Sequence, residues 1–387
     1  MKIPLIYNVR SLLHRPLTSL TTALGVGLVV LTFVGMLALA NGFRATLVST
    51  GRADNAFILR KGADGEISSG IDREHAAILK SLPEVARTAD GRAVASADVY
   101  VVVSKPRLNG TETHMPVRGV GPEVFEVRDR VEIVAGRLFT PGRAEVIVGR
   151  GMVGRMRDVG IGEKLRFGQQ EFTVVGHFAA DGSVFESEVW GDAEELMTVF
   201  RGPVYQSVAL RLTSAEAIES LRARIAADPR LQVDVKPEQQ FFAEQSGMLT
   251  TVLRFLAFFV TAIMAVGAVF GAINTMDALV AARTREIALL LTLGFKPRSV
   301  MASFLLEALL VALAGGVLGC LLALPINGIQ TSTTNWQSFG EVTFAFRITP
   351  RILLQGMAFA AVIGVLGGLL PARRASREVV AAALRKV

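Results

Sequence analysis

The sequence predicts a membrane protein of four spanning α-helices, with an α+β domain outside the cytoplasm inserted between the first and second helices. The chain of 387 residues is 51% hydrophobic with a mean hydropathy of +0.45, which is rare among soluble proteins. A bilayer core of about 30 Å needs about 20 helical residues. Apolar blocks of about that length or more occupy residues 17–40, 255–276, 300–327 and 352–370. Four buried helices of a soluble core are the alternative, which leaves their uniformly apolar character unexplained.

The distribution of basic residues predicts the orientation of the spans. Basic side chains before the first block, between the second and third, and after the fourth are Lys2, Arg10, Arg15, Arg283, Arg285, Lys296, Arg298, Arg373, Arg374, Arg377, Arg385 and Lys386. Because basic residues beside spans mark the cytoplasmic face, both termini and the 277–298 loop are expected inside. The net charge of +7 therefore reflects membrane topology and does not indicate nucleic-acid binding.

The first 41 residues predict an interfacial helix followed by a span. Residues 1–16 are amphipathic and are expected to lie in the inner interface before the first span, residues 17–41. A secretory signal peptide is the alternative, since Ala38-Leu39-Ala40 has the form of a cleavage site. The apolar run is longer than a signal peptide uses, so an uncleaved span is expected.

Residues 42–248 predict a folded domain outside the cytoplasm, with helical stalks at both ends. Strands and helices are expected at Ala56–Arg60, Arg73–Leu82, Asp98–Ser104, Ser207–Leu212, Ala215–Ala227 after a Ser214 cap, and Leu231–Val235. These two β-α-β halves indicate a split α+β module. An insertion at about 115–200 adds strands at Met115–Val120, Glu145–Gly149, Lys164–Phe167 and Glu171–His177. Helical periodicity from Glu238 to Leu253 runs into the second span, and the first span is expected to continue through Arg44–Val48.

The remaining segments alternate between spans and short connections. The second, third and fourth spans are expected at residues 249–276, 299–327 and 352–370. A coupling loop at 277–298, a short outside loop at 328–351 and a cytoplasmic tail at 371–387 connect or follow them.

Polar residues and glycines within the spans predict helix packing. Gly267 and Gly271 form a GxxxG pattern, and Gly315 and Gly319 repeat the spacing. Glu307 and Asn274 are the intramembrane polar candidates. An intramembrane acid is costly, so Glu307 is expected to face protein and pair with Arg298 or Arg283, with a proton relay as the alternative.

The sequence contains no recognisable catalytic or metal-binding arrangement. His75, His114 and His177 are scattered, and no Walker A pattern occurs, so neither a metal, a cofactor nor ATP is expected in this chain. The only cysteine, Cys320, excludes an intrachain disulfide. Acidic residues around Phe185 and Trp190 leave acid-base chemistry open, but a solvated loop or partner-contacting lip is preferred; they are Asp181, Glu186, Glu188 and Asp192.

The segment Asn274–Pro297 predicts a short helix between the second and third spans. Ile287, Leu290 and Leu291 share one helical face, Arg283 and Glu286 lie one turn apart, and Gly294 supplies a stop. On spacing alone, the basic residues could simply anchor a cytoplasmic loop.

The run RTREIALLLTLGF, residues 283–295, resembles the segment before the third span of FtsX/MacB/LolC-type permeases of ABC transporters, the type VII superfamily. In that family the segment is a coupling helix that docks on the ATPase. The resemblance implies that ATPase contacts come from Arg283, Arg285, Glu286, Ile287, Leu290, Leu291, Gly294 and Phe295. Leu291-Thr292 replaces a common Arg-Ala pair. The phrases VRGVGPEVFEV, AGRLFTPGRAEVIVG, VGIGEKLRFGQQEFTVVGHF and FESEVWGD resemble the family's periplasmic core, and the 370–375 and 382–385 phrases its tail.

The resemblance also implies a function. It implies a permease subunit in a bacterial inner membrane, working as a homodimer or heterodimer with a separate ABC ATPase dimer that binds ATP-Mg. Motion of the 284–296 helix would reach the outer domain and export or extract a lipid, lipoprotein, peptide or drug, with a periplasmic adaptor and an outer-membrane channel as further partners. An FtsX-like regulator of a cell-wall hydrolase is the alternative.

Overall fold

The computed structural model describes residues 16–200 and 202–377 and divides into two compact units. The helical unit is formed by the described residues of Met1–Asn41, Thr251–Ile329 and Phe346–Val387. The α+β unit is formed by Gly42–Thr250 and Gln330–Ala345. The interfacial helix expected over residues 1–16 falls almost wholly outside the described residues, as does the 382–385 phrase.

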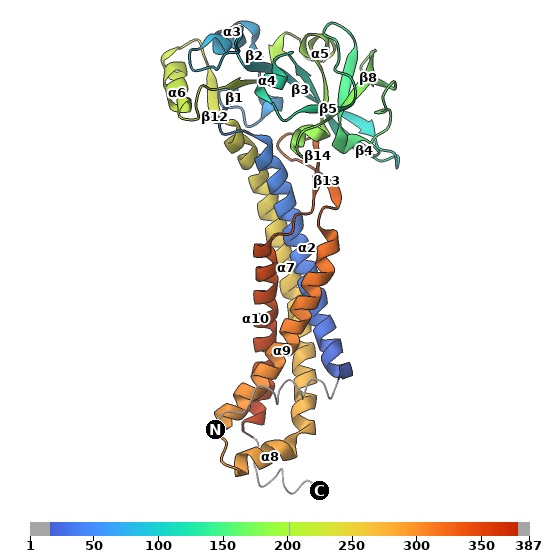
Figure 1. Cartoon of the computed structure of the whole chain (residues 1–387), viewed down its shortest axis with the longest axis vertical. Coiled ribbons are helices and arrows are strands. Elements are labelled where there is room, and N and C mark those ends of the chain that lie inside the picture. Colours follow the sequence, from blue (N-terminus) through green and yellow to red (C-terminus); the bar gives the residue numbers. More distant parts are fainter. Residues whose placement is uncertain (1–15, 201, 378–387) are drawn as a thin grey trace. The chain divides into compact units, whose positions relative to one another are not determined.

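Four helices of the described chain are long and apolar enough to cross a membrane (Figure 1). They are α2 (Pro16–Thr50), α7 (Glu238–Ala282), α9 (Pro297–Ala323) and α10 (Pro350–Ala375). The short α8 (Thr284–Thr292) lies between α7 and α9 in the chain, and the turn η4 (Leu324–Ile326) follows α9. The expected fold class, four apolar helices with an α+β domain between the first and second, is confirmed.

Glycines allow α9 to approach α2 and α10 closely. A Cβ atom on Gly315 would lie 2.5 Å from the backbone oxygen of Ala23 in α2, and one on Gly316 would lie 2.7 Å from Ala360 Cβ in α10. Farther along the antiparallel α9–α10 pair, a Cβ on Gly364 would lie 2.6 Å from Ala312. Since neither backbone can retreat without separating the helices, small residues are required at these crossings.

The two glycines of the GxxxG pattern in α7 do not lie at a close helix crossing in the described structure. Neither Gly267 nor Gly271 has an atom of another element within 4 Å of its Cβ position in the described structure. The close approach expected there is therefore not met within one chain. The reason is that no helix of the part of the chain that the structure describes lies beside this face of α7, which is the least buried of the four apolar helices.

The first lobe of the α+β unit has the order of a split β-α-β fold. Its sheet runs β12-β1-β11-β3, and all pairs are antiparallel. The elements are β1 (Asn55–Arg60), α3 (Arg73–Ser81), β3 (Ala95–Pro106), β11 (Ser207–Arg211), α6 (Ala217–Ala227) and β12 (Val233–Pro237), with η1 (Glu66–Ser68) and the pair β2 (Ile71–Asp72) and β10 (Val204–Tyr205) beside them. The expected Ser214 cap is wrong, because Glu216 occupies the N-cap position of α6.

The second lobe is the strand-rich insertion. It comprises β4 (Glu112–Val120), α4 (Val124–Val127), β5 (Glu132–Gly136), β6 (Glu145–Gly149), η2 (Arg150–Met152), β7 (Lys164–Phe167), β8 (Gln170–Ala179), η3 (Val184–Ser187), β9 (Val189–Asp192) and α5 (Ala193–Val199). Strand β3 joins the lobes, because Ala95–Asp98 pairs with β11 and Val99–Pro106 pairs with β4. The two lobes therefore share one sheet of ten strands in the described chain, although each has its own apolar core.

The connection between α9 and α10 contributes to the α+β unit. Strands β13 (Gln330–Thr334) and β14 (Glu341–Ala345) form an antiparallel hairpin that groups with this unit. What was expected to be a short outside loop at 328–351 therefore includes a structural part of the α+β unit.

Replacing Gly315 with valine should destabilise the helical unit by about 1–3 kcal/mol, because the added atoms collide with the Ala23 backbone. The measurement is the midpoint of thermal unfolding of the full chain in detergent. Gly267→Val is the matched control, since a Cβ there meets no atom within 4 Å. Equal midpoints for the two variants would contradict the packing role of Gly315.

Candidate functional site: helix α8 and a buried ionic network

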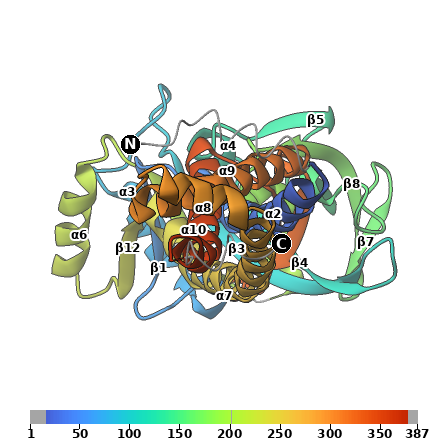
Figure 2. The same cartoon turned by 90° about the horizontal axis from the view of Figure 1, so that it is seen from below.

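Helix α8 lies at one end of the helical unit (Figures 1 and 2). Its apolar face packs against that end. Ile287 is 1% exposed and packs in a cluster contributed by α7, α9 and α10. The buried members of that cluster are Met276, Val280, Ile287, Val300, Phe304, Ala308, Ala372 and Ala375. Movement of α8 would therefore displace the ends of three long helices.

The exposed face of α8 differs from the face that the sequence suggested. Leu289 and Leu293 are 59% and 60% exposed, and Arg285 and Glu286 are exposed beside them. Ile287, expected to contact a partner, faces inward, while Leu290 and Leu291 are partly buried. The available surface is therefore Arg285, Glu286, Leu289 and Leu293, which we call the α8 outer face.

The C-terminus of α8 closes with a glycine turn. Gly294 has a φ of +87°, which favours glycine. The Gly294 N–H donates to the Leu291 carbonyl (3.1 Å) and the Phe295 N–H donates to the Leu290 carbonyl (3.1 Å), the two bonds of a Schellman motif. The predicted stop at Gly294 is confirmed, and Phe295 begins the connection to Pro297 at the start of α9.

Polar contacts fix the chain around α8. Glu307 of α9 is buried, and its carboxylate lies 3.5 Å from Arg283 Nη1, one of the two partners expected for it. Arg283 Nε is also 3.9 Å from Glu286. Asn274 lies on an exposed face of α7. Arg283, at the junction of α7 and α8, is therefore linked to α9 as well.

A second arrangement, in the α+β unit, is a buried ionic network centred on Arg118. Arg118 of β4 is 1% exposed and donates two hydrogen bonds to Glu188 (2.7 and 2.9 Å) and two to Glu66 (2.6 and 3.0 Å). Burial disfavours the guanidinium charge, but these carboxylates outweigh it and raise the Arg118 pKa, so the side chain stays charged. Glu188 also accepts a hydrogen bond from the Trp190 indole (2.7 Å).

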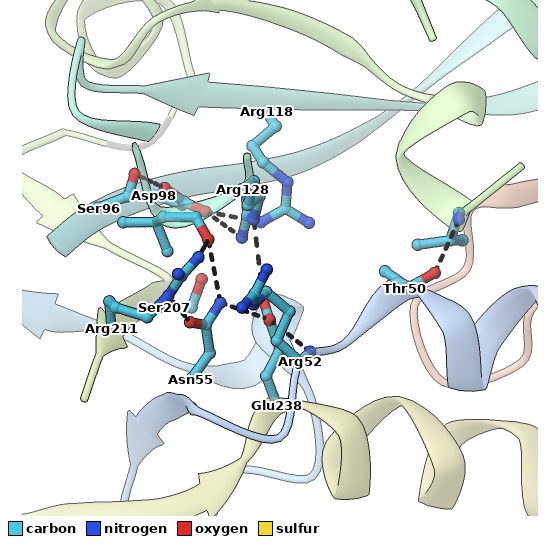
Figure 3. Close-up of polar contacts among 12 residues, drawn as sticks. Thr50, Arg52, Asn55, Ser96, Asp98, Arg118, Arg128, Ser207, Arg211 and Glu238 are labelled. Carbon is cyan, nitrogen blue, oxygen red and sulfur yellow. Dashed lines mark hydrogen bonds and ion pairs between the residues drawn. The ribbon is translucent and has the colours of Figure 1, made fainter. Parts of the chain in front are cut away.

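Asp98 continues the network toward Arg128 (Figure 3). Asp98 Oδ2 accepts from Arg118 Nη1 (3.2 Å) and from Arg128 Nη2 (2.8 Å), and Ser96 donates to its other oxygen. Burial alone would raise the Asp98 pKa, but the two arginines and the serine together lower it. Asp98 lies in β3, where the strand passes from one lobe to the other, so the network holds both lobes together.

Glu238, the first residue of α7, connects the network to the ends of both long helices. Its Oε2 accepts from the Arg52 backbone N–H (3.2 Å), two residues beyond α2, and from Asn55 Nδ2 in β1 (2.9 Å) (Figure 3). Arg128 Nε lies 3.8 Å from Glu238 Oε1. A Cβ on Gly51 would lie 2.5 Å from Gln239 Cα, so the ends of α2 and α7 are in backbone contact. Both helices therefore end at one ionic junction.

The Glu238 end of the network is less completely bonded than its Arg118 centre. Arg128 Nε and Nη1, Glu238 Oε1 and Ser183 Oγ are buried without a hydrogen-bond partner among the described residues. They adjoin a cavity of about 20 Å³. Because incompletely bonded buried polar groups are costly, this end can rearrange with less loss than the centre.

The acidic cluster around Phe185 and Trp190 is mostly buried. Glu186, Glu188 and Asp192 have little exposure, and only Asp181 is exposed, so the preferred solvated loop or lip is wrong for the other three. Sequence reasoning missed Arg118 as the cationic counterpart of Glu188 and Arg150 as that of Glu186. For Arg118 a signal was present. The available signal was an arginine inside the otherwise apolar strand MPVRGV.

Two family models match the chain. A model of the MacB-like periplasmic core domain matches residues 19–228, more than half of the chain. A model of the FtsX-like permease C-terminal region matches residues 258–380. The chain belongs to the FtsX-like permeases with a MacB-like periplasmic core domain. It is a multi-pass membrane protein, and its α+β unit is the periplasmic domain.

Curated relatives of this permease include longer proteins. The macrolide export ATP-binding/permease protein MacB of Photorhabdus laumondii is 25% identical over 404 residues, which cover 95% of this chain and 58% of the relative. The protein of the same name from Escherichia coli K12 is 29% identical over 70% of this chain and 43% of the relative. The chain spans about half the length of these relatives and matches only their permease part.

Solved structures with detectable likeness are domains. The periplasmic region of MacB from Actinobacillus actinomycetemcomitans is 14% identical and covers 50% of this chain and 92% of that chain, with a TM-score of 0.38. The extracellular domain of the noncanonic ABC-type transporter YknZ from Gram-positive bacteria is 19% identical and covers 47% of this chain and 99% of that chain, with a TM-score of 0.36.

Replacing Arg118 with methionine should destabilise the α+β unit by about 3–5 kcal/mol, because Glu66 and Glu188 would remain buried without their cation. Urea unfolding of the full chain, followed by fluorescence of the buried Trp190, measures the loss. Lys164→Met breaks the exposed Lys164–Glu171 pair and should leave stability unchanged. A similar midpoint for both variants would refute a structural role for the network.

Low pH should lower the stability of the α+β unit, because protonation of Asp98 removes its charge. Because the Asp98 pKa is lowered in the folded protein, its stabilisation is complete above about pH 4 and is lost as the pH falls further toward the lowered pKa. The urea midpoint of the wild type should therefore fall as the pH drops below about 4, and that of Asp98→Asn should fall less steeply. Parallel pH profiles for the two proteins would show that Asp98 does not carry this linkage.

Proposed function

We propose that this chain is a permease subunit that passes ATP-driven motion of a separate ABC ATPase to its periplasmic domain. The observation that carries the proposal is the placement of α8. Its inner face is packed on the ends of α7, α9 and α10, while its outer face is exposed. A partner that binds the outer face can thus move three long helices through one short one.

The continuity of α2 and α7 supports the second half of the route. Each is a single helix, of 35 and 45 residues, that begins or ends at the Glu238 junction of the α+β unit and extends into the helical unit. A continuous helix resists bending, because each turn is hydrogen-bonded to the next. Displacement at one end therefore reaches the buried ionic network at the other.

The chemistry of the α8 outer face supports a protein partner. It places two opposite charges beside two exposed leucines, a combination suited to a small apolar contact with a charged rim. The family membership favours an ABC ATPase as that partner. We place α8 and both termini in the cytoplasm of a bacterial cell, with ATP-Mg bound by the ATPase.

We propose export or extraction as the work done. The substrate class is a lipid, lipoprotein, peptide or drug, and the curated relatives named for macrolide export make a macrolide one candidate. A homodimeric or heterodimeric permease, a periplasmic adaptor and an outer-membrane channel complete the proposed assembly.

Replacing Glu286 with lysine should weaken binding of the ATPase about tenfold or more, because it reverses the charge at the centre of the outer face. Copurification with the ATPase and ATP hydrolysis by the complex are the measurements. Glu219→Lys is the matched control, since Glu219 is also an exposed helical glutamate paired with an arginine three residues away. Retention of binding and coupled hydrolysis in the Glu286 variant would refute this docking surface.

A further inference from the structure

The β13–β14 hairpin is bound to the α+β unit by a buried polar group and by apolar contacts. Val342 and Phe344 of β14 are 2% and 4% exposed. The Phe344 ring packs edge-on against Phe43 of α2, with ring centroids 5.4 Å apart. A Cβ on Gly340 would lie 2.6 Å from Pro116 of β4. This is the packing of a domain part and not of a solvent-exposed connection.

Glu341 is the polar centre of that attachment. Its carboxylate lies 2.9 Å from Arg107 Nη2 and 3.7 Å from Arg155 Nη2, and it accepts a hydrogen bond from the Thr113 hydroxyl. Burial raises the pKa of a carboxyl, but hydrogen bonds from Ser332, Thr113 and Arg107 outweigh burial and lower the Glu341 pKa. Glu341 is therefore charged, and both of its cationic partners lie in the second lobe or the turn beside it.

Further hydrogen bonds fix the position of the hairpin. The Thr343 N–H donates to Ser187 Oγ in η3 (2.8 Å), and Arg155 donates to Ser332 in β13. Asn335, between the strands, donates to Gln245 of α7 (3.0 Å), and both side chains are buried. The first two bonds restrict sliding of the hairpin along the second lobe, and the third fixes it to the part of α7 within the α+β unit.

The chain connects this hairpin to the coupling helix by a short route. Helix α9 starts just after α8, and its Val300 and Phe304 pack in the same cluster as Ile287. The other end of α9 is followed only by η4 and Asn327–Ile329 before β13 begins. Along the chain, a displacement of α9 therefore reaches Glu341 without passing through α2 or α7, and the contacts with Phe43 and Gln245 are where the hairpin meets those helices.

We propose that the β13–β14 hairpin is a separate connection that passes movement of the α9–α10 pair to the second lobe, with Glu341 as its positioning residue. The inference rests on the function proposed above. The long helices α2 and α7 are continuous with segments that lead to β1 and β12 of the first lobe, whereas the hairpin holds β4, η2 and η3 of the second. The two lobes thus receive motion by two routes, and β3 joins them.

The test compares hydrogen–deuterium exchange of the full chain, assembled with its ATPase in lipid nanodiscs, without nucleotide and with ATP plus vanadate. Glu341→Gln removes the charge and keeps the size. Hairpin peptides of this variant should exchange about tenfold or more faster, because Arg107 loses its buried partner. The nucleotide response of β4 and β9 should be lost, while the response of β1 and β12 and the ATPase rate stay unchanged.

Two controls separate positioning from general damage. Glu171→Gln removes an exposed carboxylate of the second lobe and should behave as wild type. Arg107→Gln and the Arg107→Gln/Glu341→Gln double variant complete a double-mutant cycle. If the pair acts as one unit, the double variant loses little more response than either single variant.

Two outcomes would overturn the separate connection, and a third would refute the proposed function. A full nucleotide response of β4 and β9 in Glu341→Gln overturns the separate connection. Loss of response in both lobes overturns it too, because the hairpin would then serve only general integrity. No nucleotide response in either lobe of the wild type would instead refute the proposed function.

Discussion

The structure depends on a buried guanidinium. Arg118 lies between Glu66 and Glu188 and also reaches Asp98, so residues from η1, β3, β4 and the end of η3 meet at one cation. Desolvating such charges is expensive unless every partner is in place, so the network tolerates little displacement. The same network extends through Arg128 to Glu238, so its less completely bonded end, and not its rigid centre, adjoins the ends of α2 and α7. Arg128 and Asp98 connect that end to the centre.

The helical unit combines tight and loose packing. Helices α2, α9 and α10 meet through several glycines that admit no side chain, and α7 meets α10 at one more, where a Cβ on Gly367 would lie 2.6 Å from Ala272 Cβ. Helix α7 also has a broad exposed apolar face that includes Phe255, Phe259 and Ile263. Lipid or another membrane helix is the natural environment of such a face. Helix α7 therefore has the smallest buried share of the four apolar helices of the described chain.

Much of the architecture could be predicted from the sequence, because long apolar runs and strand alternation are local signals. The four apolar helices, the β-α-β halves and the stop at Gly294 follow from spacing. The cost of buried charge narrowed the partner of Glu307 to Arg298 or Arg283, of which the structure has Arg283. The outward face of α8 could not be assigned, because the most regular apolar stripe packs inward and leaves Leu289 and Leu293 outside. GxxxG spacing likewise cannot say which glycines meet a partner. The Arg118 network was missed because its members are far apart in sequence and meet only when β3, β4 and η1 assemble.

The place of residues 330–345 bears on biosynthesis. Strand β14 brings Glu341 to Arg107, yet more than half the chain separates them and three spans precede the hairpin. Until α9 has been inserted and the segment after it translocated, the second lobe lacks the Glu341 carboxylate and the apolar side chains of the hairpin. Final maturation of the domain is therefore a late event, and a fragment ending near residue 250 would carry an unfinished surface.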